Sequence, residues 1–157
     1  MYVWNDERVD LDHHVKQLTT GKSHRFSDWS DTPIVRGPTG VYSIWNADMF
    51  VYVGMSWKES SKGLWGRMNS HASGRRSGDQ FCVYISDRFV LPTLNTDDIQ
   101  GIANGVLRLD ELTRDYIHTH LSYRYVLTET GSEARTLESH IRTEGLTGVG
   151  QPFLNPS

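Results

Sequence analysis

Two runs of β-branched and aromatic residues predict a β-hairpin in the first half of the chain. The runs cover residues 40–45 and 50–54, and a short polar break, Asn46-Ala47-Asp48, separates them; the strands are expected near 40–46 and 50–54. Val, Ile, Tyr, Phe and Trp favour strands, and a short break that contains Asn and Asp favours a tight turn. Residues 121–128 alternate in a similar way and predict a third strand of the same antiparallel sheet.

Helical spacing appears on both sides of these strands. One helix is predicted to begin after Ser60-Ser61, which can cap it, and to run through His71. A second helical pattern follows from Asp110, and a third begins at Gly131-Ser132, with Ser132 as its cap, and ends at Gly145. The pattern predicts an α+β fold in which helices pack on a small three-stranded antiparallel sheet.

The remaining segments are less regular. Residues 1–37 form an N-terminal extension with weak helical spacing, and residues 73–118 form an insert. Within the insert, residues 81–85 and 88–91 are short apolar runs separated by Ser86-Asp87, which predicts a second hairpin. With 157 residues and no clear linker, the chain is expected to form a single domain.

Composition narrows the possible classes of protein. No apolar run approaches the length of a membrane span, and the N-terminus lacks a signal-peptide pattern, so the cytoplasm is the expected compartment. The single cysteine, Cys82, excludes an intramolecular disulfide and a cysteine-based zinc site. It lies in an apolar run and is predicted to be a small buried residue.

The net charge of −3 does not by itself indicate nucleic-acid binding, and the distribution of charge is more informative. Five basic residues lie between positions 58 and 76, opposed in that span only by Glu59: Lys58, Lys62, Arg67, Arg75 and Arg76. A local basic stripe is typical of phosphate contacts. The alternative interpretation is an ordinary solvated surface.

Glu138 stands out on the last predicted helix. By helical angle it lies on the apolar face, between Ala134 and Ile141. A carboxylate that faces a core is costly unless it is paired or binds a cation. Glu138 is therefore the candidate functional acid, and a salt bridge to an arginine is the alternative.

The order of the polar residues resembles the GIY-YIG nuclease superfamily. Two triplets, Gly40-Val41-Tyr42 and Tyr52-Val53-Gly54, lie on the paired strands. Four further residues follow in the expected order: Arg67 and His71 four apart on a helix, Glu138 on a late helix, and Asn155 after a proline. Valine replaces isoleucine in both triplets, and the interval between His71 and Glu138 is long.

The resemblance implies an active site built from Tyr42, Tyr52, Arg67, His71 and Glu138. Glu138 would hold one divalent cation, Mg²⁺ or Mn²⁺, because a single hard carboxylate with water and phosphate oxygens suits these ions. Arg67 would grip the phosphate through its charged, forked guanidinium.

Tyr42, assisted by Tyr52, is the candidate general base. Lowering a tyrosine pKa from about 10 to about 7 needs roughly 4 kcal/mol of extra stabilisation of the phenolate, more than one neighbour supplies. His71 would accept a proton from Tyr42 or contact phosphate. Asn155 would orient Glu138 or a metal-bound water. Lys58, Lys62, Arg75 and Arg76 would bind substrate.

These residues predict a metal-dependent endonuclease that acts on DNA. A non-catalytic module on the same fold, which binds nucleic acid or a partner protein, and an RNA nuclease are the alternatives. A homodimer or a partner protein that supplies targeting is compatible with either.

Overall fold

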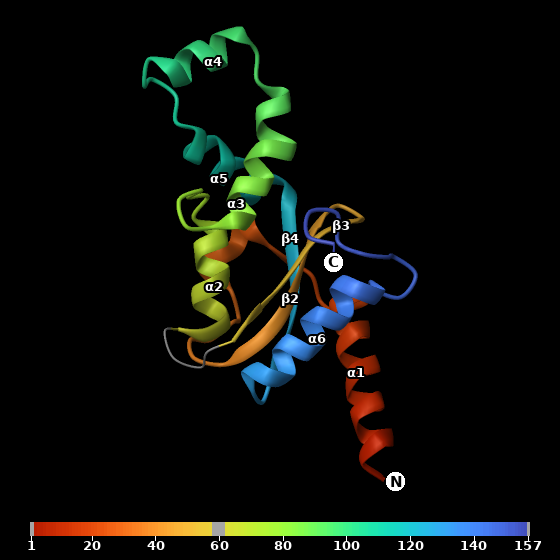
Figure 1. Cartoon of the computed structure of the whole chain (residues 1–157). Coiled ribbons are helices and arrows are strands. Elements are labelled where there is room, and N and C mark those ends of the chain that lie inside the picture. Colours follow the sequence, from red (N-terminus) through yellow and green to blue (C-terminus); the bar gives the residue numbers. More distant parts are fainter. Residues whose placement is uncertain (1, 58–61, 157) are drawn as a thin grey trace.

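The computed structural model describes residues 2–57 and 62–156 and has an α+β architecture. A four-stranded antiparallel sheet lies between two layers of helices (Figure 1). Its strand order is β1-β4-β2-β3. The strands are β1 (His24–Arg25), β2 (Thr39–Asn46), β3 (Met49–Ser56) and β4 (Leu121–Thr128).

The predicted hairpin and the predicted third strand are both confirmed. In the β2–β3 pair Tyr42 lies opposite Gly54, and in the β2–β4 pair it lies opposite Tyr125. The fourth strand, β1, was not predicted; it contributes two residues that pair with the start of β4. A two-residue strand is too short to show any alternation, so the sequence pattern gives no indication of it.

Helices cover both faces of the sheet (Figure 1). One face packs against α1 (Tyr2–Thr20) and α6 (Gly131–Glu144), and the other against α2 (Gly63–Ala72), α3 (Gln80–Ile85) and α5 (Leu109–His120). Strand β2 is central, and its side chains alternate between the two cores. Val41 and Trp45 join the α1–α6 core, whereas Tyr42 and Ile44 join the α2–α3–α5 core.

The hairpin predicted within the insert is wrong, because residues 80–85 form α3. A π-helical turn, Ser86–Val90, and a 3₁₀ turn, Leu91–Thr93, continue the chain to α4 (Thr96–Ala103). Asp79 caps α3, since its side chain accepts a hydrogen bond from the Phe81 N–H at 3.0 Å. Phe81, Cys82 and Ile85 are all buried, a spacing that a helix can place on one side and a strand cannot. Packing therefore overrides the β propensity of this segment.

The helix ends follow capping rules with one correction. The residue that caps α6 is Thr130, whose Oγ1 accepts from the Glu133 N–H at 3.1 Å, and not Ser132. The helix ends before Gly145 (φ 79°), as predicted. Ser60 and Ser61, the predicted cap of α2, lie outside the described residues. In the described part of the chain, none of the helices is long and apolar enough to cross a membrane.

Candidate active site

The glycines of the two triplets allow close approach of other groups. The Tyr42 hydroxyl lies so close to Gly54 that any Cβ at position 54 would overlap with it. At Gly40 a Cβ would meet the Val126 carbonyl oxygen of the neighbouring strand. Both positions therefore need a residue without a side chain. Gly54 of the second triplet is therefore in close contact with Tyr42 of the first triplet.

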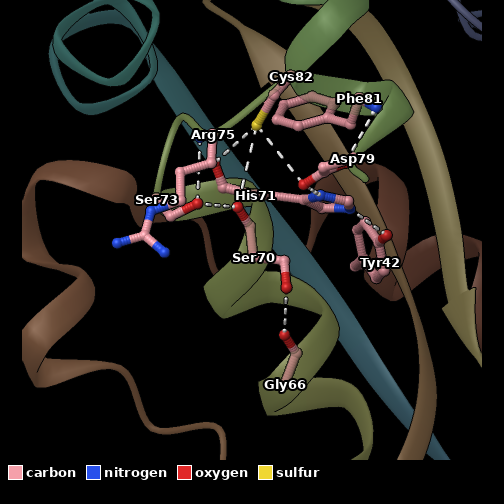
Figure 2. A network of polar contacts seen from close by, with 9 residues as sticks. All are labelled: Tyr42, Gly66, Ser70, His71, Ser73, Arg75, Asp79, Phe81 and Cys82. Atoms are coloured by element: carbon pink, nitrogen blue, oxygen red, sulfur yellow. Dashed lines mark hydrogen bonds and ion pairs between the residues drawn. The ribbon is translucent and has the colours of Figure 1, made fainter. Parts of the chain in front are cut away.

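Three buried polar groups form a hydrogen-bonded chain that we call the buried relay: Tyr42, His71 and Asp79 (Figure 2). The Tyr42 hydroxyl lies 2.6 Å from His71 Nε2, and His71 Nδ1 lies 2.7 Å from Asp79 Oδ2. Tyr42 and His71 are fully buried, and Asp79 is 7% exposed. The groups come from β2, from α2 and from the cap of α3, so the packing of three elements fixes their geometry.

The pKa shifts of the relay define the direction of its hydrogen bonds. Burial lowers the pKa of His71 by more than Asp79 raises it, so the imidazole is neutral. Burial raises the pKa of Asp79, but the hydrogen bonds from His71 and Cys82 and the nearby positive charge of Arg67 together outweigh burial, and the net shift is downward. His71 Nδ1–H therefore donates to the Asp79 carboxylate, and Nε2 accepts from the Tyr42 hydroxyl. Burial raises the pKa of Tyr42 well above its ordinary value, so Tyr42 is a neutral phenol.

A cavity of about 310 Å³, the edge cavity, lies beside β3, the edge strand of the sheet. Arg67 reaches it from α2 and Glu138 from α6, helices that cover opposite faces of the sheet. Its walls also include a tyrosine from each of β3 and α3. The residues that line it are Tyr52, Val53, Gly54, Met55, Arg67, Gln80, Tyr84, Glu138, Arg142 and Asn155. Two arginines against one glutamate give the lining a net positive charge, which suits an anion.

The position of Glu138 fits both interpretations from the sequence, a salt bridge to an arginine and a carboxylate that binds a cation. It is 13% exposed and lines the edge cavity, and its Oε1 lies 3.5 Å from Nη1 of Arg142, one helical turn away. Burial raises the pKa of Glu138, and the opposing effect of Arg142 is smaller. A carboxylate that burial disfavours as an anion gains from a nearby cation, so the position fits a divalent ion. The described residues contain no cluster of three or more His, Cys, Asp or Glu side chains placed for a metal, and Glu138 is the one acidic residue in the lining of the edge cavity.

Arg67 connects the edge cavity to the buried relay. Its side chain is exposed and lines the cavity, and its charge opposes the effect of burial on the pKa of Tyr42 and of Tyr52. The two tyrosines raise the pKa of Arg67, so the guanidinium stays charged. The rings of Tyr42 and Tyr52 stack with centroids 6.4 Å apart. Burial raises the pKa of Tyr52 as well, but only Tyr52 of the two lines the cavity.

Asn155 has a different set of partners from the one predicted. Its Nδ2 donates to the Val53 carbonyl at 2.6 Å, and its Oδ1 accepts from the Val53 N–H at 3.1 Å. The amide is therefore fixed on β3. Its contribution to Glu138 is indirect, because the Asn155 carbonyl accepts from Nε of Arg142 at 3.1 Å, and Arg142 pairs with Glu138.

The predicted basic residues do not share one cavity. Lys62 precedes α2, with Nζ 5.7 Å from the centroid of the Trp65 ring. Arg75 and Arg76 line a second cavity, and Arg76 Nε lies 2.7 Å from Asp110 Oδ1, so Arg76 has an intramolecular partner. Lys58 lies outside the described residues.

Two residues at the site were missed from the sequence. Asp79 follows Gly78 and precedes an apolar run, which is a typical N-cap position. Recognising the cap would have indicated a helix at 80–85 and a carboxylate near its start. Arg142 lies four residues after Glu138, the spacing of a helical ion pair.

Comparison with known proteins does not add to these observations. No family model, curated protein or solved structure matches the chain. The class of site is defined by its own geometry: a cationic cavity with one buried carboxylate, beside a tyrosine that is hydrogen-bonded to a neutral histidine.

Proposed function

We propose that this chain is a divalent-metal-dependent endonuclease of the GIY-YIG type that hydrolyses DNA phosphodiester bonds. One observation carries the proposal: Tyr52, Arg67 and Glu138, far apart in sequence, line one cavity beside a Tyr42–His71 hydrogen bond. A structural salt bridge would account for Glu138 alone. It would not account for a glutamate, an arginine and two tyrosines brought together from four elements.

Arg67 and Arg142 would bind the phosphate. Both guanidinium groups belong to the lining of the edge cavity, and two oxygens of a phosphate can accept two parallel hydrogen bonds from such a group. The charge of Arg67 also acts on both tyrosine hydroxyls, so Arg67 would hold the phosphate next to the groups that handle protons. The same positive charges stabilise the additional negative charge that develops on the phosphate during attack.

Glu138 would hold a Mg²⁺ or Mn²⁺ ion at the wall of the cavity. When bound, the ion would supply charge stabilisation at the phosphate and at the leaving oxygen. Arg142 keeps Glu138 in place through the 3.5 Å contact, and Asn155 keeps Arg142 in place through its carbonyl. Asn155 would thus orient Glu138 through Arg142, and not by the direct contact that the sequence suggested.

Tyr42 and His71 would remove the proton of the attacking water. Burial disfavours a free phenolate at Tyr42, so the tyrosine needs a partner that takes its proton as it accepts another. His71 Nε2, 2.6 Å away, is placed for this transfer. Asp79 fixes the tautomer that leaves Nε2 unprotonated and stabilises the imidazolium that forms.

Cleavage of supercoiled plasmid with magnesium tests the proposal, with wild type beside Glu138→Ala and Tyr42→Phe. We expect wild type to nick or linearise the plasmid and both variants to lose this activity. Glu144→Ala, an exposed glutamate of the same helix, and Tyr125→Phe, from β4, are the matched controls and should cleave normally. Chelation of the metal with EDTA should stop cleavage.

Other outcomes of these assays would contradict or change the proposed function. Cleavage that survives in both variants would assign the activity to another site or to a contaminant. Protein that binds DNA and leaves plasmid, branched and single-stranded substrates intact would point to a binding module instead. Preferential cleavage of RNA in a competition assay would change the substrate and keep the chemistry. Linearisation that requires protein association would indicate a dimer, because each chain offers one such cavity for one strand.

A further inference from the structure

The loop of residues 73–78 is fixed against α5. Gly74 (φ +72°) approaches the backbone and Cβ of Arg114 so closely that a side chain at position 74 would overlap with them. Arg76 Nε donates to Asp110 Oδ1 at 2.7 Å, and His118 Nε2 donates to the Ala72 carbonyl at 2.7 Å. These contacts give the loop a defined position although it contains two glycines and two serines.

Four arginines line the cavity between this loop and the start of α5, which we call the arginine cavity: Arg75, Arg76, Arg108 and Arg114. Its volume is about 650 Å³. The acidic residues in its lining are Asp110 and Glu111, and Asp110 pairs with Arg76. Among the described residues, the other three arginines form no ion pair, and all three are exposed. The lining therefore retains positive charge that its own carboxylates do not neutralise.

The arginine cavity is close to the edge cavity along the chain. Arg76 lines the first and Gln80 lines the second, and four residues of extended chain span at most about 14 Å. The connecting segment contains Asp79, the end of the buried relay. In Figure 2 the Arg75 side chain extends away from the Tyr42–His71 pair, so it serves a different surface from the relay.

Two neighbouring cationic cavities suit a polymer of phosphates better than a single phosphate group. A nucleic-acid duplex carries one charge per about 1.7 Å of its axis, so one duplex can contact both cavities at once. Guanidinium groups bind backbone phosphates without regard to base sequence, which fixes the register of a duplex.

We propose that the arginine cavity is a second contact for the DNA backbone, in which Arg75, Arg108 and Arg114 bind phosphates beside the one held at the edge cavity. This inference rests on the proposed function for its substrate and assigns a role to the insert of residues 73–118. Arg76 is the anchor of the loop, through Asp110, and not a phosphate ligand.

Salt-dependent binding tests the inference directly. A short fluorescein-labelled duplex is titrated with wild type and with the variant Arg75→Ala/Arg108→Ala/Arg114→Ala, in EDTA and at salt from roughly 50 to 200 mM, where the effect of phosphate contacts is large. The matched control is Lys16→Ala/Lys22→Ala/Arg25→Ala, which removes the same charge from exposed positions on α1, β1 and their connection. Arg114→Ala keeps the Cβ that Gly74 contacts, and thermal unfolding checks that each variant is folded.

We expect the slope of log affinity against log salt to fall in magnitude by about two to three in the arginine variant, close to one per lost phosphate contact. The control should keep the slope of wild type. An unchanged slope in the arginine variant, or an equal loss in the control, would overturn the inference, as would wild-type protein that does not bind duplex. Single substitutions should each lower the slope by about one; if a triple variant fails to fold, these decide the question.

The plasmid assay separates this inference from the proposed function. A reduced slope without any plasmid cleavage by wild type would support the arginine contact and reject the nuclease. Normal cleavage with an unchanged slope would reject the arginine contact alone.

Discussion

The buried relay and the edge cavity lie side by side and have opposite physical character. In the relay, Tyr42 and His71 are fully buried, and hydrogen bonds of 2.6 and 2.7 Å fix each group. In the cavity, Arg67 is exposed and Glu138 retains a partial exposure of 13%. Burial suppresses charge on Tyr42 and His71, whereas the lining of the cavity carries two arginines and a glutamate.

The difference indicates how the proposed hydrolysis would be divided between the two regions. A proton can move along the short, fixed hydrogen bond from Tyr42 to His71, where the Asp79 carboxylate balances the positive charge that forms. Phosphate and metal ions need charged ligands with access to solvent. Arg67 links the two regions, since it lines the cavity and its charge interacts with Tyr42. A phosphate bound to Arg67 would thus reach the relay without opening the core.

The largest expected effect comes from the substitution His71→Gln. A glutamine amide can accept from Tyr42 and donate to Asp79, but it cannot take up a proton. Cleavage should fall by roughly 10²- to 10⁴-fold, the usual contribution of a general base, and DNA affinity should stay unchanged. Nicking rates and duplex binding measured on the same preparation check this prediction.

Tyr52→Phe is the counterpart of that substitution in the edge cavity. If proton transfer belongs to the relay, Tyr52→Phe should reduce cleavage by less than His71→Gln. A larger loss of cleavage in Tyr52→Phe than in His71→Gln would assign proton transfer to Tyr52. The contrast between the buried relay and the edge cavity would then no longer hold.

Gly54→Ala should have the next largest effect, on stability. The added methyl group would overlap with the Tyr42 hydroxyl, and overpacking of this kind costs about 1–3 kcal/mol in the free energy of unfolding. Urea unfolding measures the change. In the Tyr42→Phe background the cost should be smaller, because the atom nearest to the new methyl is gone. Strictly additive effects in this double-mutant cycle would contradict the proposed contact.

Acid should destabilise the protein through the relay. Burial places the pKa of His71 below its ordinary value near 6.5, so between the two values the unfolded chain binds a proton that the folded chain does not. The free energy of unfolding should therefore fall as the pH drops below about 6.5, by up to about 1.4 kcal/mol per unit of pH. The lowered pKa of Asp79 extends the loss below about pH 4.

Unfolding curves over this pH range, for wild type and His71→Gln, test that prediction. The variant should lose the part that begins near pH 6.5, apart from a smaller contribution from His24, whose pKa burial also lowers. His13→Gln, at an exposed position, should behave as wild type. An identical pH dependence in His71→Gln would show that His71 is not held neutral.

Arg76→Ala should have the smallest effect. The Arg76–Asp110 pair is short, but the side chains are 40% and 44% exposed, and exposed pairs contribute less than about 1 kcal/mol. Thermal unfolding at low and high salt should show a small loss that salt removes. A loss well above 1 kcal/mol would mean that the loop of residues 73–78 contributes to the stability of the whole fold.

The sequence predicted the sheet better than it predicted the site. Strands β2, β3 and β4 have strong alternation or a strong β composition. The glycines of both triplets lie at close contacts that can be seen only in the folded structure. Glu138 was predicted to face inward from its helical angle, and the structure places it at the cavity wall. These features depend on local pattern, which a single sequence contains.

The predictions from sequence failed where contacts between distant parts of the chain determine the local structure. Residues 80–85 have the composition of a strand, but the cap at Asp79 and the burial of Phe81 and Ile85 make them helical. The contact of Asp79 with His71 depends on how α3 meets α2, so periodicity along the chain cannot indicate it. The pairing of the Asn155 amide with Val53 likewise depends on contacts between distant parts of the chain, which periodicity cannot indicate.

The C-terminal segment has a consequence for solubility. Strand β3 is at the edge of the sheet, where free N–H and C=O groups would invite pairing with another chain. The Phe153 and Leu154 N–H groups donate to the carbonyls of Phe50 and Val51, and the Asn155 amide continues the pattern at Val53 as a side-chain imitation of a strand. Residues 153–155 thus occupy the backbone groups of β3 beside the edge cavity to which a strand of another chain would otherwise bind, which protects this edge of the sheet against aggregation.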